Sequence, residues 1–127
     1  MKRRHFLATV SATAILPMPT FAAQNTLRLK AEAVMQQILP NEDGATAMLG
    51  FNGSMPGPEL RVRRGERVNI AVENGLDEGT AVHWHGIRLE NQMDGVPMLT
   101  QKLISPSDTK TYSFIPPDEG TYWYHDR

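Results

Sequence analysis

Apolar residues recur at every second position through most of this chain, and that period limits the fold more than any other feature of the sequence. The alternation runs through residues 27–33 and 68–72, and again through 109–115 and 121–125. A period of two is typical of half-buried β-strands, because successive strand side chains point to opposite faces. Gly and Pro separate the segments, as in 116–120. The sequence therefore predicts an all-β fold, an antiparallel β-sandwich or barrel.

The size and charge of the chain indicate one domain without a nucleic-acid footprint. It has 127 residues, of which 40% are hydrophobic and 21% charged, and a formal net charge of −1. Three of the 13 basic residues lie in the first four positions, so residues 23–127 retain 10 basic and 14 acidic side chains. Nucleic-acid binding needs a clustered basic face. The arginines within 61–67 come closest to one, and we interpret them as a solvated hairpin, so no nucleic-acid partner is expected.

The first 22 residues have the order of an export signal. A basic start is followed by a moderately apolar stretch, 6–16, and by the small-x-small sequence TFA at 20–22. That stretch is too short to span a bilayer comfortably. Its flanking sequence RRxFL resembles a twin-arginine signal. We expect residues 1–22 to direct export, to the periplasm or beyond, and residues 23–127 to form the mature domain, with no membrane span.

Three histidines lie in two segments that the alternation assigns to strands. The chain has no cysteine, so imidazoles and carboxylates are the ligands left for a metal ion. In AVHWHG, His83 and His85 share one face and Trp84 packs inward from the other. The two imidazoles are attached about 6.6 Å apart, which suits two neighbouring ions with one imidazole each. His125, in TYWYHDR, ends another strand and is expected to meet this pair.

Three segments also carry a family resemblance. They are FNGSMPGPELRVRRGERVNIAVENGL, HWHGIRLENQMDGVPMLTQ and GTYWYH, within residues 46–125. In order and spacing they resemble the first cupredoxin domain of the multicopper oxidases, the laccase-like enzymes. The resemblance implies a Greek-key β-sandwich and copper as the cofactor. It also implies an enzyme that takes electrons from a reducing substrate and reduces dioxygen to water at a trinuclear cluster.

The same resemblance implies a role for each histidine. His83 would bind the type 2 copper, His85 one of the paired type 3 coppers, and His125 another type 3 copper. Asp94, in MDGVP, would be a carboxylate beside the cluster that assists proton delivery. Read without the family, Asp94 is equally well a turn residue of an Asp-Gly pair.

Four further residues invite a functional role, and we expect none for them. Trp84 and Trp123 are interpreted as core packing rather than as electron carriers. Met93 and Met98 are interpreted as fillers of packing gaps rather than as soft copper ligands. No site is assigned to either pair.

The chain departs from the family at its end. The family's second motif reads H-x-H, whereas this sequence reads His125-Asp126-Arg127. A guanidinium has donors only and stays protonated, so Arg127 cannot coordinate copper. By the resemblance, we also expect the chain to lack a final strand, the type 1 site and the C-terminal cupredoxin domains. We therefore expect a sandwich that is incomplete at its C-terminus, and a truncated domain that is inactive alone.

Two other functions remain open at this point. One is a periplasmic module that captures copper without turnover. The other is a degenerate sandwich that binds no metal, in which each histidine is an ordinary hydrogen-bonded side chain.

Overall fold

The computed structural model describes residues 26–40 and 44–127. Its elements are six strands and one 3-10 turn: β1 Leu27–Gln36, β2 Thr46–Phe51, β3 Val68–Asn74, β4 Val82–His85, η2 Asn91–Met93, β5 Thr109–Phe114 and β6 Trp123–Asp126. The predicted signal, 1–22, lies outside the described residues. Within the described part of the chain, no helix has the length and apolar character needed to cross a membrane.

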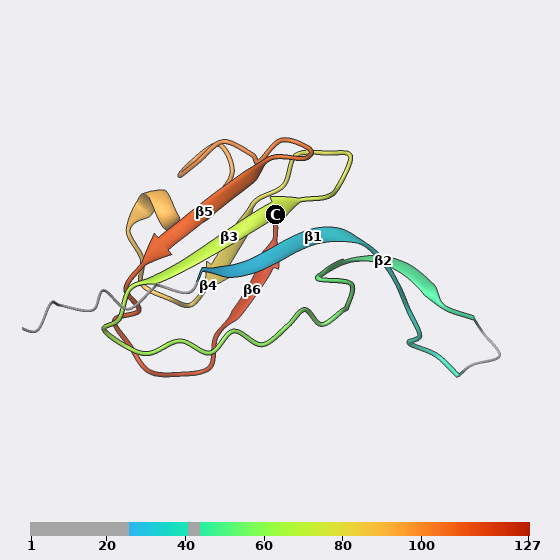
Figure 1. Ribbon diagram of the computed structural model, residues 1–127, viewed down its shortest axis with the longest axis horizontal. Coiled ribbons are helices and arrows are strands. Elements are labelled where there is room, and N and C mark those ends of the chain that lie inside the picture. Colours follow the sequence, from blue (N-terminus) through green and yellow to red (C-terminus); the bar gives the residue numbers. More distant parts are fainter. Residues whose placement is uncertain (1–25, 41–43) are drawn as a thin grey trace, which may run out of the picture.

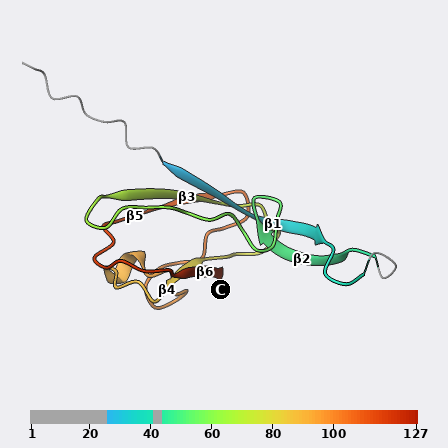
Figure 2. The same cartoon turned by 90° about the horizontal axis from the view of Figure 1, so that it is seen from below.

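The strands form two sheets, which confirms the all-β prediction and its sandwich form. One sheet has the order β2-β1-β3-β5 and the other pairs β4 with β6. Figure 2 shows the two layers, with β3 and β5 in one and β4 and β6 in the other. Three of the strand pairs are antiparallel, but β1 runs parallel to β3. The expectation of a purely antiparallel sandwich was therefore wrong in this respect.

β1 changes partner along its length, and its alternation changes phase at the same place. Its first half pairs with β3 through Ala31, and its second half pairs with β2 from Ala31 onward. Leu29 and Ala31 face the core as predicted, but Ala33 is exposed and Val34 is buried instead. The second half belongs to a hairpin with β2 that projects beyond the rest of the domain (Figure 1).

The core lies between the two sheets and is built around Trp84, as the alternation predicts. Only 3% of this residue is exposed. Its ring lies 5.3 Å from that of Tyr112, 5.5 Å from that of Phe114 and 5.9 Å from that of Tyr124, measured between centroids. Because β4 carries Trp84 inward, the residues on either side of it in the sequence are turned to the outer face of the small sheet.

A groove of about 920 Å³ opens beside this aromatic cluster. Its walls include interior side chains of both sheets, among them Phe51, Ile70, Trp84, Phe114 and Tyr124. Tyr124, one of the lining residues, donates a hydrogen bond of 2.7 Å from its hydroxyl to the Pro58 carbonyl. Burial raises the pKa of Tyr124, so the hydroxyl remains a donor well above neutral pH.

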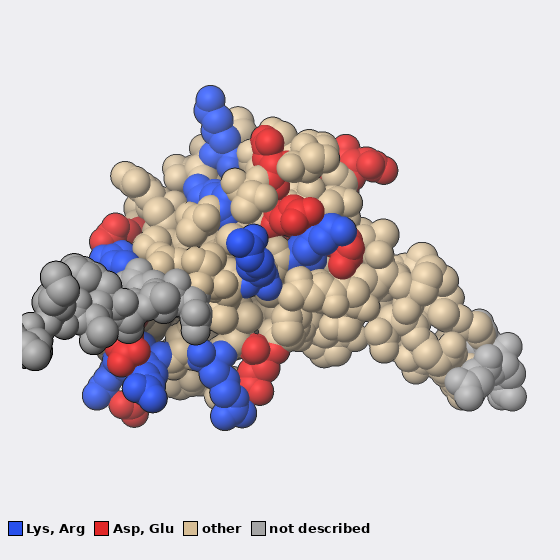
Figure 3. Space-filling model, viewed as in Figure 1, with Lys and Arg blue, Asp and Glu red and all other residues tan. Residues whose placement is uncertain are grey.

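On the face drawn in Figure 3, basic and acidic side chains lie side by side rather than in a continuous basic stripe. In the arginine-rich segment, Arg61 pairs with Glu59 at 3.0 Å and Arg64 with Glu119 at 3.2 Å. These exposed ion pairs neutralise neighbouring charges and contribute little to the free energy of unfolding.

Candidate metal centre

β4 and β6 place the three histidines on one face of the two-stranded sheet. In the antiparallel register, His83 lies opposite His125, and His85 lies opposite Trp123. The neighbours of these histidines, Val82 and Trp84, are buried on the inner face. The structure therefore confirms that the H-x-H pair projects from a common surface and that His125 joins it.

The three imidazoles converge closely enough to hold metal. One ligand nitrogen from each ring lies within 4.8 Å of the others. The ring centroids are 5.4 Å apart for His83 and His85, 5.4 Å for His83 and His125, and 5.6 Å for His85 and His125. Imidazole nitrogen is a metal ligand that suits copper. Three such nitrogens that converge on one face therefore fit a copper ion.

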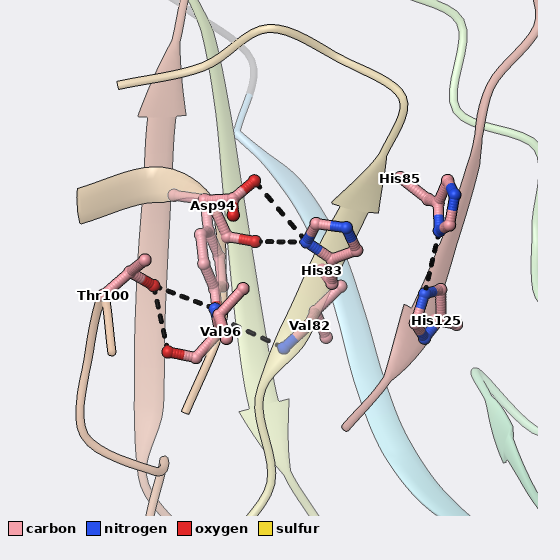
Figure 4. A network of polar contacts seen from close by, with 8 residues as sticks. Val82, His83, His85, Asp94, Val96, Thr100 and His125 are labelled. Atoms are coloured by element: carbon pink, nitrogen blue, oxygen red, sulfur yellow. Dashed lines mark hydrogen bonds and ion pairs between the residues drawn. The ribbon is translucent and has the colours of Figure 1, made fainter. Parts of the chain in front are cut away.

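A backbone carbonyl fixes the proton on His83. Its Nδ1 lies 2.6 Å from the carbonyl oxygen of Asp94 (Figure 4). A carbonyl oxygen only accepts, so Nδ1 carries the hydrogen and Nε2 keeps its lone pair. His83 is therefore prepared to bind an ion through Nε2, in the way that metal-binding histidines commonly donate their other ring N–H.

His125 is prepared in the same way and faces His85. Its Nδ1 donates to the carbonyl oxygen of Asp126 at 3.0 Å, which leaves Nε2 as the nitrogen with a lone pair. That Nε2 lies 3.4 Å from Nδ1 of His85 (Figure 4). Two nitrogens bonded at about 2 Å to one tetrahedral ion lie about 3.3 Å apart. The pair therefore has the separation of two ligands of a single ion.

Asp94 lies beside His83. Besides the carbonyl contact, its Oδ1 is 3.5 Å from His83 Nδ1. The residue follows η2 and is brought to β4 by Gly95, whose φ is +73° and whose added Cβ would lie 1.7 Å from the Val82 carbonyl oxygen. Only glycine allows this approach of the loop to the strand.

Gly95→Ala is expected to push the loop away from β4, which lengthens the Asp94–His83 hydrogen bond and weakens metal binding about tenfold. Titration of the purified variant with Cu(II) measures the change. Gly53→Ala is the matched control, because Gly53 also has a positive φ, +77°, but its Cβ would meet nothing within 4 Å. Equal losses of affinity in the two variants would show that steric approach at Gly95 is irrelevant to the site.

Trp123 lies against the histidine cluster and not in the core, so the packing prediction for this residue was wrong. It is 58% exposed. Its ring stacks on His85 at 4.6 Å and 26°, and on His125 at 4.4 Å and 29°. The signal was present in the sequence, because the alternation places Trp123 on the same face as His125.

The two methionines differ from each other. Met93 packs against the core, and its sulfur accepts a hydrogen bond from the Ser113 N–H at 3.4 Å, in agreement with the gap-filling interpretation. Met98 is 89% exposed and has a φ of +63°, so it fills no gap. The expectation for Met98 was wrong, because its turn carries the side chain into solvent.

The loops that lead out of β4 and into β6 are joined by an ion pair. Arg88 donates two hydrogen bonds of 2.9 Å to the carboxylate of Asp118. These bonds hold the pKa of Asp118 below its usual value. Arg127 is exposed, and its backbone N–H donates to the Ala81 carbonyl at 3.0 Å, extending the β4–β6 pairing.

The comparison with known proteins places this geometry in a family. The multicopper oxidase family model matches residues 32–127. The chain belongs to the multicopper oxidase family. This confirms the resemblance seen in the sequence. The three histidines lie within the matched residues, 32–127.

Individual relatives agree with this assignment. Copper resistance protein A of Escherichia coli is 38% identical over 97% of this chain and 22% of its own length. The solved structure of Lac15, from a marine microbial metagenome, is 51% identical with a TM-score of 0.77, and the match covers 80% of this chain and 27% of Lac15. The multicopper oxidase of Pseudomonas thermotolerans is 39% identical with a TM-score of 0.75, covering 80% of this chain and 24% of that one. The chain thus spans about a quarter or less of these relatives.

Proposed function

We propose that this chain is the copper-binding N-terminal domain of an exported multicopper oxidase. Its three histidines would contribute to the type 2 and type 3 coppers of a trinuclear cluster. The observation that carries the proposal is the convergence of three imidazoles on one face, two of which have Nδ1 bound to a backbone carbonyl, so that the lone pair is on Nε2. Export rests on residues 1–22, which carry the twin-arginine-like sequence.

The type of copper proposed for each histidine comes from the family resemblance, and the contacts of the rings suggest which nitrogen would bind it. His83 would bind the type 2 copper through Nε2. His85 through Nδ1 and His125 through Nε2 would share one type 3 copper, since these atoms lie 3.4 Å apart. This sharing revises the sequence-based interpretation, in which the two residues bind separate type 3 ions.

Copper held there would supply the one-electron chemistry by which a reducing substrate is oxidised and dioxygen is reduced to water. The residues of the chain orient the ligands and manage protons around them. The Asp94 carbonyl keeps the hydrogen on His83 Nδ1. Its carboxylate, 3.5 Å from the same nitrogen, is our candidate for the group that relays protons to the cluster. The indole of Trp123 covers the rings of His85 and His125 on one side.

The chain by itself does not hold every part that this activity needs. It has no cysteine, so the thiolate of a type 1 copper must come from another segment or chain. Arg127 stands where the family places a further type 3 ligand. We therefore propose that the chain alone binds copper but does not turn over, which also describes the alternative function, a copper-capturing module.

A chimaera separates the two functions. Residues 26–125 replace the matching segment of the Pseudomonas thermotolerans oxidase, whose own sequence supplies everything after His125. We expect full copper loading, measured by mass spectrometry of the metal, and oxygen consumption with a reducing substrate. In the matched chimaera with His83→Ala, oxygen consumption is expected to fall at least about 100-fold. A folded, copper-loaded chimaera without oxygen consumption would overturn the oxidase assignment and favour the copper-capturing module.

A further inference from the structure

The far side of the small sheet carries an acidic residue that the metal site does not use directly. Asp126 follows His125 in β6, so its side chain points to the inner face, where it is half-buried. A carboxylate on that side requires a hydrogen-bonding partner. The partner is Thr80, whose hydroxyl donates to Asp126 Oδ1.

Thr80 is a fixed point of the fold. Only 2% of it is exposed. Its backbone N–H donates to the Ile104 carbonyl at 3.1 Å, and the Ile104 N–H donates back to the Thr80 carbonyl at 2.7 Å. With both backbone groups bound and its side chain enclosed, Thr80 can hold Asp126 in one position.

Asp126 contacts the metal site through its backbone. Its carbonyl oxygen accepts the Nδ1 hydrogen of His125 at 3.0 Å. That carbonyl shares its planar peptide unit with the Arg127 N–H, which donates to the Ala81 carbonyl at 3.0 Å. The bond from Thr80 holds the same residue from its side chain. A polar connection therefore runs from the buried Thr80 hydroxyl through Asp126 to the ring of His125.

We infer that Asp126, held by Thr80, is a positioning residue that sets the tautomer and ring orientation of His125 at the metal site. The inference rests on the proposed function for its meaning, because an Nδ1-protonated His125 offers Nε2 to the ion it shares with His85. It also explains how a four-residue strand paired on one side only can present a fixed imidazole.

The test reads the tautomer in the metal-free full chain by long-range ¹H–¹⁵N NMR correlation. In the unaltered chain we expect His125 as the Nδ1–H tautomer. Thr80→Val keeps the shape but removes the hydroxyl, and is expected to give a mixture of tautomers at His125 and an affinity for Cu(II) about tenfold lower. Thr80→Ser retains the hydroxyl donor and Asp126→Asn retains the oxygen acceptor, so each of these single variants should keep His125 as the Nδ1–H tautomer. His83 is the internal control, since its proton is held by Asp94.

Two results would overturn the inference. One is an unchanged His125 tautomer in folded Thr80→Val. The other is an equal change at His83 and His125, which would indicate a general loosening of the sheet. If Thr80→Val does not fold, the His125 tautomer is measured in Asp126→Ala instead and judged by the same criteria. Asp126 is only half-buried, so its replacement disturbs the core less. Because the tautomer is measured without metal, failure of the chain to bind Cu(II) would count against the proposed function and leave this inference standing.

Discussion

Replacing His85 and His125 together by alanine is expected to lower the affinity of the chain for Cu(II) at least about 100-fold, since even residues behind the ligands of a metal site alter affinity 10–100-fold. The two rings offer the nitrogens that lie 3.4 Å apart, so their loss removes the pair proposed to share one ion. Calorimetric titration against a competing chelator measures the change.

The fourth histidine supplies the matched control for this variant. In the full chain with residues 1–22 retained, His5→Ala removes one imidazole outside the cluster and is expected to leave the affinity unaltered. Wild-type affinity in the double variant would mean that copper is held elsewhere. A metal-free sandwich, the third function considered from the sequence, predicts no specific binding in any of these chains.

Trp84→Ala is expected to lower the free energy of unfolding by about 3–5 kcal/mol, the usual cost of truncating a buried tryptophan. Trp84 is 3% exposed and its ring contacts the rings of Tyr112, Phe114 and Tyr124. Such a loss is a large fraction of the total stability of a small domain. Urea denaturation followed by circular dichroism measures it.

Trp123→Ala is the matched control, because it removes a side chain of the same size and chemistry from an exposed position. Because Trp123 is 58% exposed, the expected loss of stability is below about 1 kcal/mol. Its effect should fall instead on metal binding, through the rings of His85 and His125. Equal destabilisation by the two substitutions would contradict the description of one tryptophan as core and the other as part of the site.

Local periodicity was sufficient to predict the parts of the site that lie within single strands. Alternation in 81–85 sets His83 and His85 on one face and Trp84 on the other, and the same rule applies to His125. The all-β class followed from the same signal. The family's motifs supplied copper, which no spacing in the chain could distinguish from other ions that imidazole binds.

The parts that the sequence could not predict depend on contacts between distant residues. β1 runs parallel to β3 over its first half, and the phase change at Ala33 comes just after β1 changes partner. β2 was not predicted at all. The bond from Thr80 to Asp126 joins residues 46 positions apart, and the carbonyl that fixes His83 comes from a loop 11 positions away. No local pattern encodes such pairs.

A crystal of the chain grown with Cu(II), with anomalous diffraction measured at the copper absorption edge, tests the central claim most directly. The account predicts an anomalous peak about 2 Å from both His85 Nδ1 and His125 Nε2, with His83 Nε2 turned to the same face. A copper peak held only by carboxylates or methionine sulfur, with no copper at the three imidazoles, would contradict it.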